Sequence, residues 1–378
     1  MPSLFESTHP IGRQFELDAI CQTFAADGDL MLTGVTGSGR RTLIRHAARH
    51  IGARVLELDC LRATTSDRFL KLLAEGLLDL FSEPQELQWI EQWSQRSRHV
   101  SFQRAVHRGV LTWAATGQAA WTVFKELLTL PQVLAEQLDC RIVFLFENFP
   151  HIRAWDRSNQ WEAYLREEIQ RQSRVSYAVV ATIPEAWAQN SSLKVMTLPP
   201  LPQQTLEDWA IGVMASQGLK FGADALALFL SYVQGHVGDA SNLIRRIWVD
   251  YQAAAYTQVE TQRLHSQEAP SFNPARSVVE LDRVHHSTQA LIDDLTTTFE
   301  SLLLLLPPIQ ARVLESLAID PTDSPHAREY VQKHQLSKGG GLQGALASLE
   351  QKGLIYGPKE GYAIALPLFR LWLKNRLS

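Results

Sequence analysis

Cysteine, long apolar runs and an excess of charge of either sign are all scarce in this sequence. The 378 residues include 3 cysteines, which are widely separated and lack metal-ligand spacing. They indicate neither a disulfide framework nor a zinc site. The longest apolar runs, such as residues 302–306, are far too short to cross a bilayer. The net charge of -4 gives no general electrostatic attraction to nucleic acid or to an anionic membrane.

The composition is that of a folded globular protein. Hydrophobic residues make up 45% of the chain and charged residues 20%, which is far from the composition of disordered chains. The length favours two or three domains of ordinary size. Residues 1–10 lack a basic stretch followed by an apolar run, so we expect a cytoplasmic protein with no membrane anchor.

A glycine-rich segment lies between a predicted buried strand, residues 29–33, and a predicted helix, residues 43–51. Phosphate-binding loops have the form G-x-x-x-x-G-K-[ST], in which backbone amides wrap phosphates, lysine reaches the outer phosphates and the hydroxyl binds magnesium. The alternative is a tight turn without a ligand. We predict a degenerate loop whose nucleotide-binding residues are Gly34, Thr36, Gly37, Ser38, Gly39, Arg40 in place of lysine, Arg41 in place of the hydroxyl residue, and Thr42.

The strands that follow favour a parallel sheet. Residues 141–146 and 176–181 are continuous apolar runs typical of central parallel strands, and residues 155–172 between them predict a crossover helix. Residues 65–137 have an almost wholly helical pattern, which indicates an insertion. We therefore predict an α/β P-loop NTPase fold, a parallel sheet with flanking helices, over residues 1–200, with the insertion at about 65–137.

Two further units are predicted after the sheet. Prolines near residue 200 break the chain, and three helices then form a helical lid over residues 201–260. Residues 261–297 are predicted to be a polar linker. Residues 298–378 predict three helices, the first at 302–317, followed by a hairpin, which is a winged-helix pattern.

The second apolar run carries a family resemblance. Residues 144–150 read FLFENFP, which resembles the apolar run and Asp-Glu-Phe-Pro of prokaryotic archaeal-type ATPases in the AAA+ and STAND groups. The resemblance implies bound ATP or ADP. It gives Glu147 the place of the acid that holds magnesium, and Asn148 the place of the acid that orients water. Because the amide of Asn148 cannot act as a general base, we expect weak or absent hydrolysis. The candidate magnesium ligands are Thr42 and Glu147. Alternatively, or at the same time, Glu147 caps a neighbouring loop or pairs with an arginine such as Arg40.

Other positions extend this resemblance. Gly12 and Arg13 are similar to the box that borders the adenine site, although a surface turn explains them equally well. Thr182 matches the polar first sensor at a strand end, or it is a cap. Residues 234–239, QGHVGD, resemble a Gly-His-Pro-Gly segment, and either Arg245 or Arg246 then takes the place of the second sensor. At least one of these two arginines is expected on a solvated helix face.

The C-terminal segment leaves its partner open. Residues 342–355 resemble the recognition helix and first wing strand of winged-helix domains, which suggests DNA. Residues 298–378 contain 9 Lys or Arg against 7 Asp or Glu, a weak positive balance for phosphate contacts. Protein contact or packing within the chain is the favoured interpretation. Self-oligomerisation is also expected from the resemblance, with Arg174 either an arginine finger or a structural residue.

Three functions follow from the sequence. The first is an ATP-binding regulatory or scaffold protein with weak or absent hydrolysis, because Arg40, Arg41, Glu147 and Asn148 replace the four main catalytic residues. The second is an active ATPase in which Thr42 or Glu147 holds magnesium. The third is a DNA-binding adaptor that acts through the winged helix, with Lys338 and Lys359 as phosphate contacts.

Overall fold

The computed structural model describes residues 10–104, 109–114, 117–169, 171–265, 277–336, 340–358 and 361–377. The chain divides into two compact units. The sheet unit comprises residues 13–34 and 40–198. The lid and winged-helix unit comprises residues 1–12, 35–39 and 199–378.

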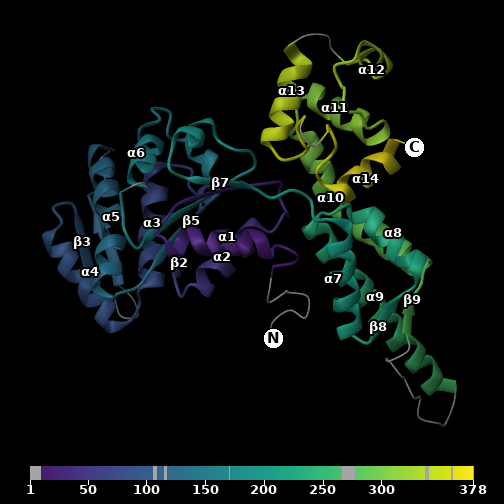
Figure 1. Ribbon diagram of the computed structural model, residues 1–378, viewed down its shortest axis with the longest axis horizontal. Coiled ribbons are helices and arrows are strands. Elements are labelled where there is room, and N and C mark those ends of the chain that lie inside the picture. The colour runs from purple at the N-terminus through teal and green to yellow at the C-terminus, as the bar shows by residue number, and fades with distance from the viewer. Residues whose placement is uncertain are drawn as a thin grey trace. The chain divides into compact units, whose positions relative to one another are not determined.

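A five-stranded parallel sheet forms the centre of the sheet unit (Figure 1). The strand order is β2-β5-β6-β1-β7, so β6 lies between the strand that precedes the glycine-rich loop and the strand that ends at Glu147. All five strands therefore end at one edge, which brings residues distant in sequence together. The strands are β1 Leu30–Thr33, β2 Arg54–Asp59, β5 Ile142–Glu147, β6 Val175–Ala181 and β7 Lys194–Thr197.

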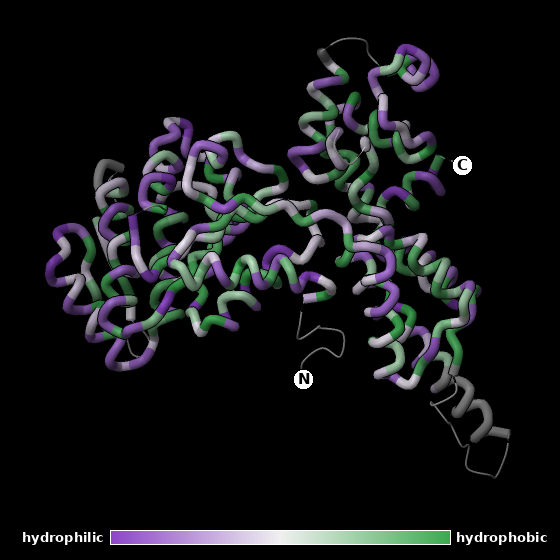
Figure 2. The backbone as a smooth tube through the Cα atoms, viewed as in Figure 1, coloured by the Kyte–Doolittle hydropathy of each residue, from purple (hydrophilic) through white to green (hydrophobic). Residues whose placement is uncertain are grey.

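Helices bury both faces of this sheet. Successive side chains of a strand point to opposite faces, so each strand contributes to both cores. Leu30 and Leu32 pack with α1 and α2 on one face, whereas Met31 joins the core formed with α3 and α5 on the other. Figure 2 shows the hydrophobic residues along these strands. The helices are α1 Gln14–Ala25, α2 Arg40–His50, α3 Ser66–Leu80, α4 Pro84–Arg96, α5 Gly117–Gln137 and α6 Gln160–Glu168, with short 3-10 helices at Cys60–Arg62, Phe149–Ala154 and Ala186–Asn190.

The insertion is not almost wholly helical as the sequence predicts. Between α4 and α5 the chain forms an antiparallel hairpin of β3, Val100–Arg104, and β4, Gly109–Trp113. The aromatic residues of the insertion belong largely to the hydrophobic core on one face of the sheet. Phe124 stacks on Trp161 with ring centroids 4.5 Å apart. The hairpin escapes prediction because its strands are short and no Asn-Gly or Asp-Gly pair separates them.

The predicted linker is partly structured. A short strand pairs parallel with the lid, and residues 281–297 belong to a long helix, so the expectation of a polar linker over 261–297 is wrong there. The helix has apolar positions that pack with both the lid and the C-terminal core. Residues 266–276 lie outside the described chain. The lid elements are α7 Gln203–Ser216, β8 Leu219–Phe221, α8 Ala223–Val233, α9 Val237–His265, β9 Ser277–Val279 and α10 Leu281–Leu304.

The C-terminal residues form the predicted helices and a reduced wing. The expected helix 302–317 is divided, because Pro307 and Pro308 end α10 and begin α11. The wing has an isolated bridge between Ile355 and Ile364, and the Tyr356 amide donates to the Ala363 carbonyl at 2.8 Å. The helices are α11 Pro308–Ile319, α12 Arg328–Lys333, α13 Gly340–Gln351 and α14 Pro367–Leu377.

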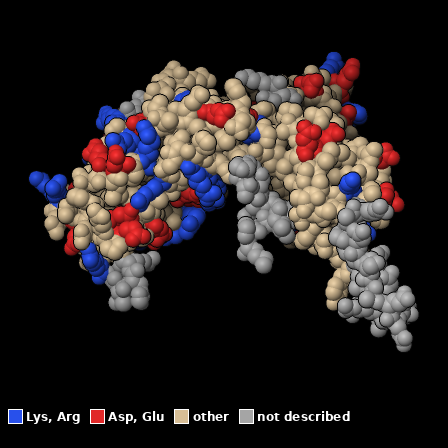
Figure 3. Space-filling view, turned by 60° about the horizontal axis from the view of Figure 1, so that its bottom comes forward, with Lys and Arg blue, Asp and Glu red and all other residues tan. Residues whose placement is uncertain are grey.

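The surface carries charges of both signs. Figure 3 shows acidic and basic side chains next to one another on the face that it displays. Ion pairs such as Arg141 with Asp27 and Lys71 with Asp67 connect them. Within the described chain, no helix is both long and apolar enough to span a bilayer.

Candidate functional site

The glycine-rich loop has the backbone of an anion cradle. Gly34, Gly37 and Gly39 have φ angles of 150°, 83° and 89°, a region that side chains other than glycine rarely adopt. The loop directly precedes the first residue of α2, so backbone amides and the positive end of the helix dipole are next to one another. The predicted strand, loop and helix are therefore present.

Two features of the loop indicate space for a polar ligand. The Ser38 hydroxyl is buried and has no hydrogen-bond partner among the described residues. A Cβ atom added to Gly39 would meet nothing within 4 Å. A buried polar group without a partner costs about 1–3 kcal/mol, so a ligand that bonds to Ser38 would remove this cost. A phosphate group fits these requirements.

Arg40 is anchored to the sheet. Its Nη1 atom donates to the carbonyl oxygen of Ala181, the last residue of β6, at 2.6 Å. Burial lowers the pKa of Arg40, while the negative charge of Glu147 opposes this change. The guanidinium group at the lysine position is thus already held by the end of β6.

Arg41 occupies the place expected for a magnesium-binding hydroxyl. Its Nε atom lies 2.7 Å from Oε1 of Glu147, and its Nη2 atom lies 2.6 Å from Oε2 of Glu57. Arg45 contacts Glu57 as well, with Nη2 at 2.6 Å from Oε2. The alternative that Glu147 pairs with an arginine is therefore correct, but the arginine is Arg41 and not Arg40.

The two carboxylates of this network differ in acidity. Burial raises the pKa of Glu147, with Arg41 opposing and the neighbouring carboxylates reinforcing the change. Burial also acts to raise the pKa of Glu57, but hydrogen bonds from Arg45 and Arg41 outweigh it and lower the pKa. Glu57 is therefore the more strongly charged partner of the two arginines.

These residues do not fit a magnesium ion. The guanidinium group of Arg41 lies beside Glu147 and would repel a divalent cation there, although its hydrogen bonds go to Glu57 and Oε1 of Glu147 has no hydrogen-bond partner in the described chain. Thr42 is exposed on α2, and no hydrogen bond of its hydroxyl is found within the described chain. Across that part of the chain, no cluster of three or more His, Cys, Asp or Glu side chains could hold a metal ion.

Asn148 is held by a carboxylate that the sequence analysis did not select. Its Nδ2 atom donates to Oδ1 of Asp59 at 2.9 Å, and its backbone is left-handed with φ of 52°, which asparagine tolerates. Asp59 ends β2 and stands opposite Glu147 in the parallel register. Strand order is needed to find this neighbour, because 89 residues separate Asp59 from Asn148.

The remaining predicted residues have defined surroundings. The carbonyl of Thr182 accepts the amide of Gly34 at 3.1 Å, so its backbone is engaged. Gly12 has φ of 59°, and a Cβ atom there would lie 2.0 Å from Thr205. Arg13 is buried and pairs with Glu16 at 2.8 Å. Arg245 is exposed on α9.

Two other arginines discussed as functional candidates form ion pairs. Arg246 lies 2.8 Å from Asp250 and also contacts Asp294. Arg174 has a left-handed backbone and forms an ion pair with Asp139.

His236 contacts the loop from the turn before α9. Its Nε2 atom lies 2.7 Å from the carbonyl oxygen of Thr36, and the Asp239 amide donates to its Nδ1 atom at 3.0 Å. In the neutral ring, this arrangement places the proton on Nε2. The Gly238 amide donates to the carbonyl of Gly37 at 3.0 Å. The QGHVGD motif pointed to this turn, but His236 itself was not selected as a site residue.

Asp239 extends these contacts to the last helix. Its Oδ2 atom accepts the backbone amide of Leu368, in the first turn of α14, at 3.0 Å. Burial acts to lower the pKa of His236, but Asp239 and the hydrogen bond to Thr36 outweigh it and raise the pKa. Hydrogen bonds thus run from loop residue Thr36 through His236 and Asp239 to α14.

Comparisons with known proteins agree with this architecture. Residues 297–375 match a family model described as a probable winged helix domain. A Walker-type ATPase of Pyrococcus abyssi is 13% identical, with 98% of this chain and 100% of that chain covered and a TM-score of 0.64. Orc1 of Aeropyrum pernix, solved in complex with DNA, is 15% identical (100% and 94% covered, TM-score 0.48), and Cdc6p of Pyrobaculum aerophilum is 12% identical (100% and 99%, 0.47). A search of curated proteins gave no match.

At this level of identity, the likeness to the Pyrococcus ATPase shows the fold. The chain has an α/β P-loop NTPase fold followed by helices and a winged helix, so the predicted fold class is confirmed. Residue roles and activity do not follow from the fold.

Proposed function

We propose that this chain is an AAA+/STAND-like regulatory or scaffold protein that binds ATP or ADP and hydrolyses it weakly or not at all. The ion pair between Arg41 and Glu147 carries this proposal. It replaces the oxygen ligands of magnesium with a fixed positive charge, which can attract phosphate but cannot supply the chemistry of a metal ion.

The loop supports nucleotide binding. The left-handed glycines leave the backbone free to approach an anion. The amides of Thr36, Gly37 and Gly39 and the N-terminus of α2 would hold the phosphates, because the amides of Gly34 and Ser38 already donate to backbone carbonyls. The buried hydroxyl of Ser38 would gain a hydrogen-bond partner. The adjacent Arg40 and Arg41 would add positive charge.

The surroundings of Asn148 argue against hydrolysis. An amide cannot accept a proton from water at neutral pH. Its NH2 group is directed to Asp59, which in turn accepts the Leu61 amide at 3.1 Å. The alternative of an active ATPase requires Thr42 or Glu147 to bind magnesium, and the ion pair of Glu147 with Arg41 opposes it.

Calorimetric titration with ATP and with ADP, each with and without magnesium, tests this function. We expect saturable binding whose affinity changes less than about threefold on adding magnesium, equivalent to roughly 0.7 kcal/mol. Phosphate release should stay far below ~1 per second, the low end for working enzymes. Magnesium-dependent turnover that Glu147→Gln abolishes would establish the active ATPase instead. No binding of either nucleotide would leave the loop a structural turn.

For the winged helix, we propose contact with protein or with other parts of this chain in preference to DNA. Helix α13, at the position of a recognition helix, has no lysine or arginine over Gly340–Gln351. Contacts to duplex phosphates require such cations. Lys338 and Lys359, the predicted phosphate contacts, lie outside the described residues.

Fluorescence anisotropy with a labelled DNA duplex at low salt tests this choice. We expect no saturable binding by the native chain. Salt-sensitive binding that weakens on Lys338→Gln and Lys359→Gln would instead support the DNA-binding adaptor. Sedimentation of the same samples shows whether the chain self-associates, as the ATPase resemblance implies.

A further inference from the structure

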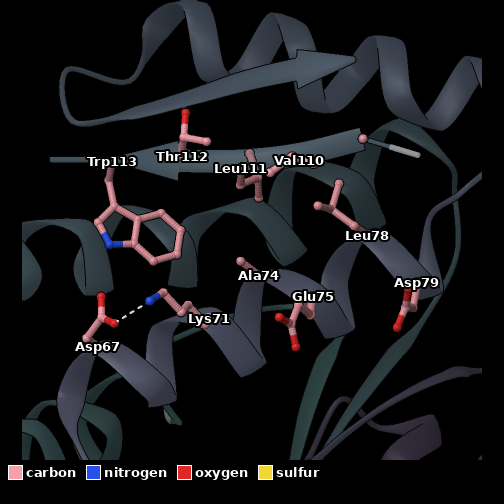
Figure 4. A pocket seen from close by; sticks show the side chains of 11 residues that line it. Asp67, Lys71, Ala74, Glu75, Leu78, Asp79, Val110, Leu111, Thr112 and Trp113 are labelled. Carbon is pink, nitrogen blue, oxygen red and sulfur yellow. Dashed lines mark ion pairs between the residues drawn. The ribbon is translucent and has the colours of Figure 1, made fainter. Parts of the chain in front are cut away.

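A second candidate site lies in the helical insertion, far along the chain from the glycine-rich loop. A groove of about 480 Å³ separates α3 from β4 (Figure 4). This volume falls in the range of ordinary ligand pockets. Its apolar lining comes from Ala74 and Leu78 of α3 and from Val110, Leu111 and Trp113 of β4. Figure 4 shows Leu78 and Trp113 pointing into the space between the two elements.

The β4 side of the groove is a strand edge. All five residues of β4, Gly109–Trp113, line the groove. Side chains alternate between the faces of a strand, so a face would contribute every second residue, whereas an edge contributes each one. In the described part of the chain, β4 pairs with β3 alone. Its second edge therefore offers backbone groups to an added strand.

The α3 side is one acidic stripe of the helix. Asp67, Lys71, Glu75 and Asp79 follow each other at intervals of four residues, which places them on one face. Lys71 pairs with Asp67 at 2.7 Å. Glu75 and Asp79 are exposed and have no ion-pair partner among the described residues. Within the described chain, two exposed carboxylates without an ion-pair partner therefore lie along the rim of the groove.

The two walls can be compared in length. From Asp67 to Asp79 the helix rises about 18 Å, at 1.5 Å per residue. From Gly109 to Trp113 the strand rises about 13 Å, at 3.3 Å per residue. An extended segment of about five residues therefore matches β4 and extends along most of the helix wall.

We propose that this groove binds an extended peptide segment of a partner protein, with alternating apolar and basic residues. The peptide pairs with the free edge of β4. Its apolar side chains pack on Leu78 and Trp113, and its Lys or Arg side chains reach Glu75 and Asp79. The groove shares no lining residue with the glycine-rich loop, and it gives the insertion a role in partner recognition.

The probe is an acetylated, fluorescein-labelled peptide of seven residues that alternates lysine and valine, titrated by fluorescence polarisation. One twin replaces every lysine with glutamate. A second twin carries N-methyl groups on alternate backbone amides, which removes the hydrogen bonds of one strand edge. We expect saturable binding of the basic peptide, at least tenfold weaker binding of the acidic twin, and loss of binding for the N-methylated twin.

Charge reversal on α3 gives the matched test. The double variant Glu75→Lys and Asp79→Lys should prefer the acidic twin to the basic peptide. The control reverses Asp293 and Glu300, exposed positions of α10, and should behave like the native chain. Thermal unfolding confirms that each variant is folded. The proposal is overturned if the native chain binds neither peptide, if α3 charge reversal leaves the preference unchanged, or if N-methylation has no effect.

Discussion

Arg41 and Glu147 form an ion pair, with Nε and Oε1 2.7 Å apart, between the first turn of α2 and the last residue of β5. In the proposed function, this side chain supplies the positive charge beside a phosphate. The pair also connects α2 to the end of β5, and through Glu57 it reaches β2. Because the fixed cation belongs to one side chain, its contribution can be tested by substitution.

Replacing Arg41 with threonine should create magnesium dependence. The substitution frees Glu147 and restores a hydroxyl at the expected position, so ATP affinity should rise about tenfold on adding magnesium, equivalent to about 1.4 kcal/mol. Arg41→Lys retains the positive charge and serves as the control, with no magnesium response expected. Calorimetry measures both. Equal magnesium responses in the two variants would contradict the role given to Arg41.

Asn148→Asp should destabilise the fold at neutral pH. The new carboxylate would lie beside Asp59, whose Oδ1 atom now accepts from Asn148 at 2.9 Å. The lost hydrogen bond and the repulsion should lower the free energy of unfolding by roughly 1–3 kcal/mol. The double variant Asp59→Asn with Asn148→Asp restores a donor and an acceptor and should recover most of the loss. Urea unfolding completes the double-mutant cycle, and additive effects would show that the pair is not coupled.

Asp29 should make the fold less stable as pH rises. Burial raises its pKa to about 7, against the hydrogen bond that it accepts from the Tyr177 amide at 2.8 Å. The folded state therefore binds a proton that the unfolded state releases near pH 4. Its stabilising effect is complete below about pH 4 and is lost as pH rises through about 7.

Asp29→Asn removes this titration and keeps an oxygen acceptor for the Tyr177 amide. The variant should be more stable than the native chain at pH 8, by on the order of 3 kcal/mol, and no more stable at pH 4. Asp282→Asn, at an exposed position of α10, is the control and should change little. Urea unfolding across this pH range measures the difference. The prediction would be contradicted if, between pH 4 and pH 8, the native chain became more stable relative to the Asp29→Asn variant.

Loss of the His236 side chain should increase local opening of both the glycine-rich loop and the first turn of α14. His236→Ala removes the hydrogen bond to the Thr36 carbonyl and frees Asp239 from the ring. Amide hydrogen exchange should become several-fold faster in residues 35–39 and at the start of α14, while β5 and β6 stay protected. His285→Ala, which loses a bond to Tyr232, is the matched control. Unchanged exchange at Leu368 would show that the contact with Asp239 is independent of the histidine.

The same contact should depend on pH. The folded-state pKa of His236 is raised above its ordinary value, so protonation of the ring stabilises the fold. This stabilisation is fully present below the unfolded pKa of about 6.5 and is lost as pH rises through the folded pKa. Protection of residues 35–39 should therefore fall as pH rises above about 6.5, once exchange rates are corrected for pH. In His236→Ala this decrease should be absent.

The sequence by itself determined the local elements of this protein. Continuous apolar runs predicted β5 and β6, the glycines of residues 34–39 predicted a loop between a strand and a helix, and the position of Arg41 predicted the loss of a hydroxyl ligand. Such features depend on backbone sterics and on side-chain periodicity, which neighbouring residues encode. Local signals were weaker for β3 and β4. Their strands are short, and the helical pattern of the residues on either side led to a helical prediction for the whole segment.

Only the tertiary structure decided which distant charges meet. Asp59 lies beside Asn148 because β2 and β5 are adjacent in the sheet, and His236 lies on Thr36 because the lid turn packs against the loop. The pairing of Glu147 with Arg41, and not with Arg40, depends on the direction of each side chain from the first turn of α2. Residue type and spacing do not encode these contacts, because strand order and side-chain direction result from the packing of the whole core.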